Sequence, residues 1–173
     1  MSAVFPIIIN PFAPRKMTFL EVLDKIDDEL RDKTIRERLE MLERSIGAGE
    51  QTEIPTRHYF GPGIYAREIF IPRGTVLTGK IHKFQHLNIV SKGDISVLTE
   101  NGVQRVKAPF TMVSPPGTKR AGYAHEDTVW TTIHGTDETD LDNLEAHFIA
   151  KDHAEYLQFA QAQQMIEGDI WHG

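Results

Sequence analysis

Apolar residues follow two different periods along this chain. Before residue 50 they recur three or four positions apart, a spacing that places them on one face of a helix. Beyond Ile54 they fall into short runs separated by glycine, proline and asparagine, which is typical of strands joined by tight turns. The chain is therefore predicted to begin with helices and to continue as a β domain. The helical positions are Leu20, Leu23, Ile26 and Leu30 in one stretch and Ile35, Leu39, Leu42 and Ile46 in the next.

Both helical stretches begin at a capping box, in which a threonine and the glutamate three residues later accept hydrogen bonds from free backbone N–H groups. The two pairs are Thr18 with Glu21 and Thr34 with Glu37, and Gly47 is predicted to end the second helix. Prolines before the first box cannot donate into a helix, so they predict an extended arm.

The region after the helices is predicted to form an antiparallel double-sheet barrel, with a two-residue hairpin at Asn101-Gly102. The acidic segment 137–143 is predicted as a loop, and Asp152 with Glu155 predicts a last helix that ends at Gly168. The candidate strands are 57–60, 64–71, 75–82, 87–91, 94–99, 103–107, 110–114, 128–134 and 144–149. The predicted parts are an arm and helical extension over 1–50, a barrel over 51–150 and a C-terminal helix over 151–173.

Composition narrows the class of protein. With 173 residues the chain is long enough for one well-buried domain and does not require a second. A net charge of -6 gives no basic excess, so we expect no nucleic-acid partner. No apolar stretch approaches the length of a membrane span, and the lack of cysteine suits a reducing compartment, so we expect a cytoplasmic protein without a membrane partner.

Two histidines, His82 and His86, lie in the glycine-bounded stretch 74–93 at the centre of the strand region. In a straight strand they share one face, but four residues span roughly 13 Å. The two imidazoles can therefore share a metal ion only if the chain bends between them.

This stretch resembles the first motif of the cupin superfamily, which reads Gly, five residues, His, one residue, His, three or four residues, Glu, six residues, Gly. Here the order is Gly74, five residues, Lys80, one residue, His82, three residues, His86, six residues, Gly93. The segment 115–120, Pro-Pro-Gly-Thr-Lys-Arg, resembles the second motif. The resemblance implies a mainly β fold, a single double-stranded β-helix or cupin jelly-roll barrel. The pattern is also similar to cupin-domain proteins of tailed bacteriophages and their hosts, and this similarity implies no particular activity.

The metal ligands of the family motif are only partly present. Lys80 stands where the family has the first His, His82 matches the second, His86 replaces the Glu, and Arg120 replaces the His of the second motif. Imidazole nitrogens suit zinc, iron, copper or nickel better than magnesium or calcium. The expected cofactor is a divalent transition metal, namely zinc, iron, nickel or manganese. We therefore expect His82 and His86 to bind a metal, with His134 as a third ligand if it points inward. The alternative is that His82 and His86 are only hydrogen-bonded in a polar cavity and that His134 is a surface histidine at the end of its strand.

Lys80 and Arg120 would repel a divalent metal but could bind a carboxylate or phosphate. We expect an anion pocket in the barrel mouth that also includes Glu68, Tyr123 and Trp130. The alternative is that both cations reach solvent or pair with Glu68 or Glu126.

Two functions stay open from the sequence. One is a noncatalytic protein that binds a small anionic ligand, a metal or both in the barrel mouth. The other is a metal-dependent cupin enzyme, such as an isomerase, lyase or oxygenase acting on a small polar metabolite. Because barrel sheets leave exposed edges that the apolar arm over 4–12 could cover on a neighbouring subunit, we also expect a homodimer.

Overall fold

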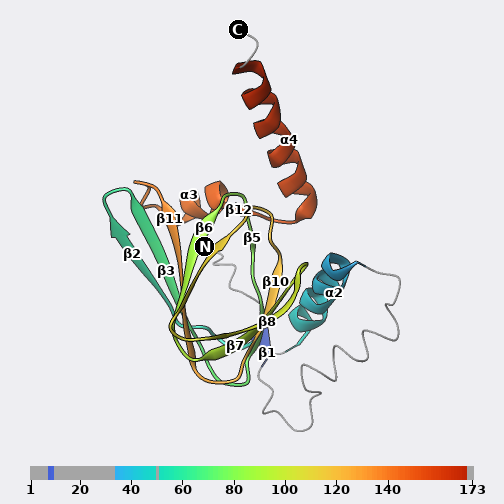
Figure 1. Ribbon diagram of the computed structural model, residues 1–173, viewed down its shortest axis with the longest axis vertical. Coiled ribbons are helices and arrows are strands. Elements are labelled where there is room, and N and C mark those ends of the chain that lie inside the picture. Colours follow the sequence, from blue (N-terminus) through green and yellow to red (C-terminus); the bar gives the residue numbers. More distant parts are fainter. Residues whose placement is uncertain (1–7, 10–33, 50, 171–173) are drawn as a thin grey trace.

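The structure is a computed structural model that describes residues 8–9, 34–49 and 51–170. Two five-stranded sheets, both built from antiparallel neighbours, face each other (Figure 1). Sheet A consists, in spatial order, of β1 (Ile8–Ile9), β4 (Val76–Thr78), β10 (Arg120–Ala124), β7 (Asp94–Thr99) and β8 (Gly102–Lys107). Sheet B consists of β2 (Thr56–Gly61), β3 (Ile64–Ile71), β11 (Thr128–Gly135), β6 (His86–Lys92) and β9 (Phe110–Ser114). A short pair, β5 (Ile81–His82) with β12 (Ile149–Ala150), lies at one end.

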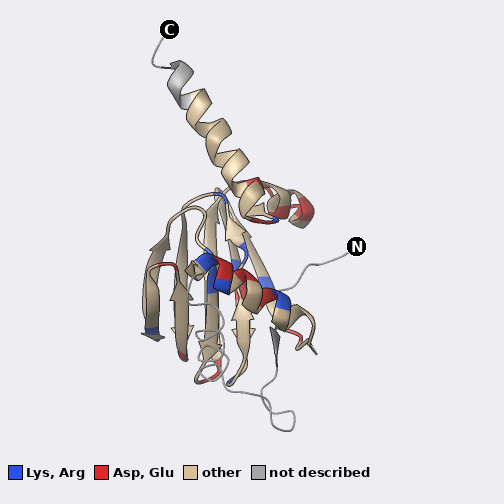
Figure 2. Ribbon diagram, turned by 90° about the vertical axis from the view of Figure 1, so that its right-hand side faces the viewer, with Lys and Arg blue, Asp and Glu red and all other residues tan. Residues whose placement is uncertain are grey.

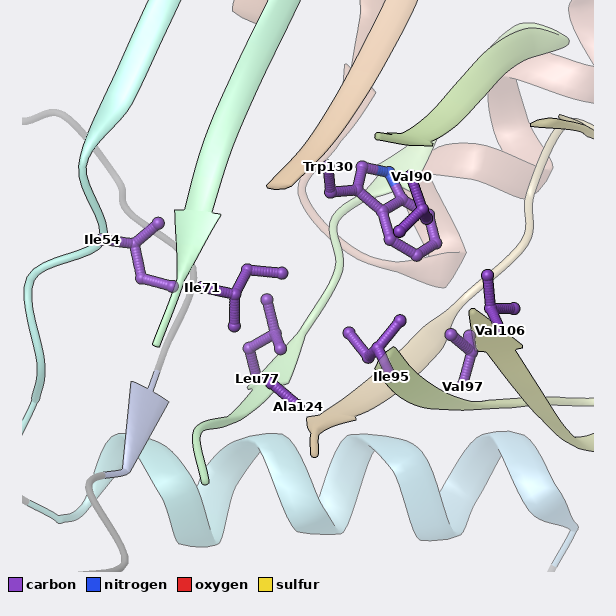
Figure 3. Packing of buried hydrophobic residues seen from close by; sticks show 9 residues of the cluster. All are labelled: Ile54, Ile71, Leu77, Val90, Ile95, Val97, Val106, Ala124 and Trp130. Atoms are coloured by element: carbon purple, nitrogen blue, oxygen red, sulfur yellow. The ribbon is translucent and has the colours of Figure 1, made fainter. Parts of the chain in front are cut away.

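This strand order is a double-sheet jelly roll, so the predicted fold class is confirmed. The main core lies between the sheets, where alternate residues of each strand point inward (Figure 3). Its buried members are Ile54, Ile71, Leu77, Val90, Ile95, Val97, Val106, Ala124 and Trp130.

Most of the predicted strands are present, with two differences that matter for the site. The single predicted strand 75–82 is two strands, β4 and β5, broken at Gly79 and Lys80. The strand β10 was not predicted, because its sequence Arg-Ala-Gly-Tyr-Ala contains small residues of low strand propensity. The hairpin between β7 and β8 is confirmed, but its two loop residues are Glu100 and Asn101, and Gly102 opens β8 with a φ of 104°.

Helix α2 (Ile35–Gly47) begins at the predicted capping box of Thr34 and Glu37. It packs on the outer face of sheet A, over β4 and β10, and buries its apolar stripe there (Figure 2). The carboxylate of Glu43 on this helix accepts hydrogen bonds from Lys119 Nζ at 2.6 Å and from Thr78 Oγ1 at 3.1 Å. The buried residues of the stripe are Leu39, Leu42 and Ile46.

The C-terminal part corrects the sequence prediction. The expected strand 144–149 is helix α3 (Leu141–Phe148), followed by the two residues of β12. Asp140, which was predicted to lie in a loop, is its N-cap and accepts from the N–H groups of Asp142 and Asn143. Helix α4 (His153–Ile170) begins where predicted but continues past Gly168, and it projects from the barrel (Figure 1).

Several predictions for the N-terminal part lie outside the described residues. These include the helix that begins at Thr18 and most of the arm over 4–12. The described arm residues Ile8 and Ile9 pair with β4 of the same chain, so this part of the arm covers an edge of its own sheet. The homodimer therefore stays a prediction. No helix in the described part of the chain is long and apolar enough to cross a membrane.

Candidate metal centre and ligand cavity

A bend brings the two predicted metal ligands together. Strand β5 ends at His82 and β6 begins at His86, and the intervening residues turn the chain. The N–H of Lys83 donates to the carbonyl oxygen of Phe148 at 2.7 Å, which holds this turn against α3. The imidazole centroids of His82 and His86 lie 4.1 Å apart. The bend that a shared metal ion requires is therefore present.

His134 joins this pair from strand β11. It shares the inward face of that strand with Trp130 and Thr132, because side chains alternate along a strand. Its ring centroid lies 5.1 Å from those of both His82 and His86. All three residues offer a ring nitrogen, and these nitrogens lie within 4.8 Å of one another. His134 is only 4 % exposed, which excludes its alternative as a surface histidine.

Hydrogen bonding leaves ring nitrogens available to a metal. His86 Nδ1 lies 3.0 Å from the carbonyl oxygen of Phe84, so this ring can present Nε2 inward. His82 Nδ1 is buried and has no hydrogen-bond partner within the described residues. A buried polar atom without a partner is costly, and a metal ligand bond would satisfy it.

Burial also favours the neutral imidazoles that metal binding requires. It lowers the pKa of His82 well below its usual value, and the neighbouring imidazoles of His86 and His134 lower it further. Burial likewise lowers the pKa of His86, and it is the main reason that the pKa of His134 falls to about 4. All three rings are therefore neutral at pH 7, the form that coordinates a metal.

A cavity of about 90 Å³ adjoins the three histidines, and His82 lines it. Its wall comes from both sheets. The polar lining includes Arg67, Lys80, Arg120 and Thr132, and the apolar lining includes Ile69, Ile71, Leu77, Ile95, Val97 and Trp130. Lys80, Arg120 and Trp130 thus lie where the sequence predicted a ligand pocket.

Arg120 is held in this cavity by neutral groups. Its guanidinium donates through Nη2 to Ser114 Oγ and lies 5.9 Å from the ring of Trp130. Asn88 fixes both of these neighbours, because its Nδ2 donates to Ser114 Oγ and its Oδ1 accepts from Trp130 Nε1. Burial lowers the pKa of Arg120 to about 10, so the guanidinium stays charged at pH 7.

Arg67 is a second guanidinium in the cavity, and sequence reasoning missed it. Its side chain points inward from β3, on the same face as Tyr65 and Ile69. Because side chains alternate along a strand, this spacing could have indicated from the sequence that Arg67 faces the cavity. Among the described residues, no ion pair joins Arg67 or Arg120 to a carboxylate. Lys80 differs, because it pairs with Glu145 of α3 at the rim.

Two predicted pocket residues do not line the cavity. Glu68 faces outward from β3, where its carboxylate lies 3.7 Å from Arg57 and accepts a hydrogen bond from Tyr59. Tyr123 faces outward from β10 and packs with the α2 stripe. Both predictions were wrong for the same reason, since the inward face of each strand depends on a register that motif spacing does not determine.

No protein-family model and no curated protein matches this chain. Among solved structures, KdgF from Halomonas is similar with a TM-score of 0.42 and 19 % identity over 50 % of this chain and 84 % of that one. A cupin superfamily protein from Desulfitobacterium hafniense has a TM-score of 0.43 and 8 % identity over 54 % and 86 %. An acetylacetone dioxygenase from Acinetobacter johnsonii has a TM-score of 0.41 and 15 % identity over 47 % and 59 %. The jelly-roll assignment rests on the strand order.

Proposed function

We propose that this protein binds a divalent transition metal through His82, His86 and His134 and a small anionic ligand in the cavity beside it. One observation carries the proposal. Three neutral imidazoles with nitrogens within 4.8 Å of one another adjoin a cavity whose two guanidiniums have no carboxylate partner among the described residues.

The three imidazoles fit zinc, iron or nickel better than manganese, which prefers oxygen ligands. When bound, such a metal would polarise an oxygen atom of the ligand as a Lewis acid. The chain's own contribution is to hold the rings. The carbonyl oxygen of Phe84 orients His86, and the pairing of Ile149 with His82 orders β5. Phe148 stacks on His134 with 4.1 Å between the ring centroids, which excludes water from that side of the imidazole.

The cations favour an anion as the second partner. A buried guanidinium without a counter-charge is costly, and the internal carboxylate expected from Glu68 lies on the outer face of the sheet. An incoming carboxylate or similar oxyanion supplies that charge, and a planar guanidinium can give it two parallel hydrogen bonds.

A metal-dependent isomerase, lyase or oxygenase is the alternative. Proton transfer in such enzymes most often uses a histidine or a carboxylate placed near the substrate. In this protein the three clustered histidines are the proposed metal ligands. The described lining of the cavity contains cations, hydroxyls and apolar groups but no carboxylate. This composition supports binding without turnover.

Metal content tests the proposal. Untagged protein, purified without chelator and dialysed, is analysed by mass spectrometry of its metals. We expect about one metal ion per chain, and none in the triple variant of His82, His86 and His134 to Ala. His125→Ala is the matched control, because this histidine bonds Ser96 Oγ outside the cluster. Full metal content in the triple variant, or none in the wild type after incubation with each candidate metal, contradicts the metal assignment.

A further inference from the structure

The lining of the cavity changes from polar to apolar with depth, and the strand register defines which residues form each layer. In sheet B, Thr132 pairs with Arg67 on one side and with Asn88 on the other, which forms a polar layer directly below His134. Two residues deeper, Trp130 pairs with Ile69 and with Val90, which forms an apolar layer.

Sheet A repeats this order. Arg120 is the first inward residue of β10, and Gly122 follows it two residues deeper. Gly122 pairs with Leu77 on one side and Val97 on the other, both of which belong to the core (Figure 3). From the mouth inward, the cavity therefore presents first the histidines, then the guanidiniums and then an apolar floor. This floor is formed by Ile69, Leu77, Val97 and Trp130.

We propose that the ligand is a short-chain monocarboxylate, with its carboxylate between Arg67 and Arg120 and its hydrocarbon tail on the apolar floor. This inference rests on the proposed function, since it names the class of anion that the same cavity takes. The guanidiniums lie between the metal ligands and the floor, so one charged head satisfies them while an apolar tail continues inward.

The floor excludes the other common small anions. Sugar phosphates carry hydroxyl groups that need partners, and burying them without hydrogen bonds is costly. The only polar atom of Trp130, Nε1, already donates to Asn88 Oδ1 at 2.9 Å. Inorganic phosphate and sulfate would satisfy the guanidiniums but leave the apolar floor uncovered.

The volume limits the length of the tail. The cavity of about 90 Å³ is several times the volume that a single water molecule needs. Such a space accommodates a tail of about two to four carbons, and each methylene that fits should tighten binding about fourfold.

Gly122→Ala provides a way to shorten the space for the ligand's tail by about one methyl group. A Cβ at this position would meet Ile95 Cδ1 at 3.1 Å and Leu77 Cδ2 at 3.2 Å, close enough to displace these side chains slightly into the cavity. Gly61→Ala is the matched control, because a Cβ there has no atom within 4 Å.

The experiment is a calorimetric titration of the full chain, with its metal content measured, against acetate, propionate, butyrate, valerate and hexanoate. Inorganic phosphate and a sugar phosphate are titrated in parallel. We expect affinity to rise about fourfold per carbon to an optimum and then fall. Gly122→Ala should move the optimum to a shorter acid, Gly61→Ala should leave it unchanged, and Arg67→Gln and Arg120→Gln should each weaken every acid at least tenfold.

The outcomes separate this inference from the proposed function. If inorganic phosphate or the sugar phosphate binds as tightly as the best acid, and chain length has no effect, the monocarboxylate is wrong while an anion site stands. If none of the anions binds the wild type, the anion site itself is wrong. A chain-length optimum that Gly122→Ala does not move would place the tail elsewhere and overturn the assignment of the floor.

Discussion

Two consecutive residues, Lys119 and Arg120, bring a buried and a half-buried cation to opposite faces of sheet A. Lys119 is 4 % exposed under α2, where its Nζ donates to Glu43 Oε1 at 2.6 Å. Arg120 points between the sheets, where its guanidinium donates to the neutral Ser114. One cation is neutralised by its own chain, and the other has no carboxylate partner among the described residues.

The difference separates a structural cation from the cation that we propose to bind a ligand. Burying an ion pair is tolerated when the geometry satisfies both partners, whereas an unpaired buried charge is a cost that folding alone does not explain. Lys119 therefore helps to hold α2 on the barrel. Arg120 lines the cavity, and the proposed anion would offset the cost of its unpaired charge by binding the folded protein.

The largest expected effect is on the structural side. Glu43→Gln leaves Lys119 buried without a counter-charge, so we expect the free energy of unfolding to fall by about 2 kcal/mol, below the usual cost because the Glu43 side chain is 33 % exposed. Urea denaturation followed by circular dichroism measures it. Glu40→Gln on the same helix is the control, and an equal loss in both variants would remove the special role of the Lys119 pair.

Removing Arg120, the proposed ligand-binding cation, should have the opposite effect on stability. In Arg120→Met a flexible apolar side chain of similar length replaces the unpaired charge, so we expect the ligand-free protein to gain about 1 kcal/mol of stability. The same denaturation experiment measures the gain, and titration should show that anion binding is lost. A loss of stability as large as that of Glu43→Gln would mean that Arg120 is structural too.

A smaller effect is expected at Gly79, which faces the stem of Arg120. A Cβ at residue 79 would lie 3.1 Å from Arg120 Cγ, so Gly79→Ala should displace the guanidinium by a few tenths of an ångström. We expect stability to change by less than about 1 kcal/mol while anion affinity falls several-fold. Titration of Gly79→Ala beside Gly61→Ala measures both, and unchanged affinity would show that the position of Arg120 is not critical.

The smallest effect is expected at the ion pair of Asp94 with Arg105, whose cation is exposed. Asp94 accepts two hydrogen bonds from Arg105, each 2.8 Å long, and the Arg105 side chain is 55 % exposed. The hydrogen bonds from Arg105 lower the pKa of Asp94 below its usual value of 3.8. The contribution of the Asp94 carboxylate to stability is therefore present above pH 3.8, and it is lost as the pH falls through the lower pKa of the folded state.

Melting midpoints measured between pH 7 and pH 3 test the contribution of the Asp94–Arg105 pair. Asp94→Asn should lower the midpoint slightly at pH 7, and the difference from the wild type should shrink as the pH falls below 3.8. If the two proteins keep the same difference at every pH, the charge of Asp94 contributes nothing and the effect of the substitution is steric.

The local sequence determined where the elements lie and which residues could be ligands. Capping boxes, turn glycines and alternation act over a few residues, so α2, most strands and the hairpin after β7 were predictable. Motif spacing singled out His82 and His86, and the reach of a strand required the bend that the structure contains.

Only the tertiary structure decided which face each residue occupies and what it meets there. A strand residue points inward or outward according to pairing with distant strands, so Glu68 and Tyr123 were placed wrongly and Arg67 was missed. His134 meets His82 and His86 from a strand some fifty residues away, an arrangement that depends on the jelly-roll order. Lys119 and Arg120 are adjacent cations in sequence, and they differ in role because alternation sends one to Glu43 and the other into the cavity.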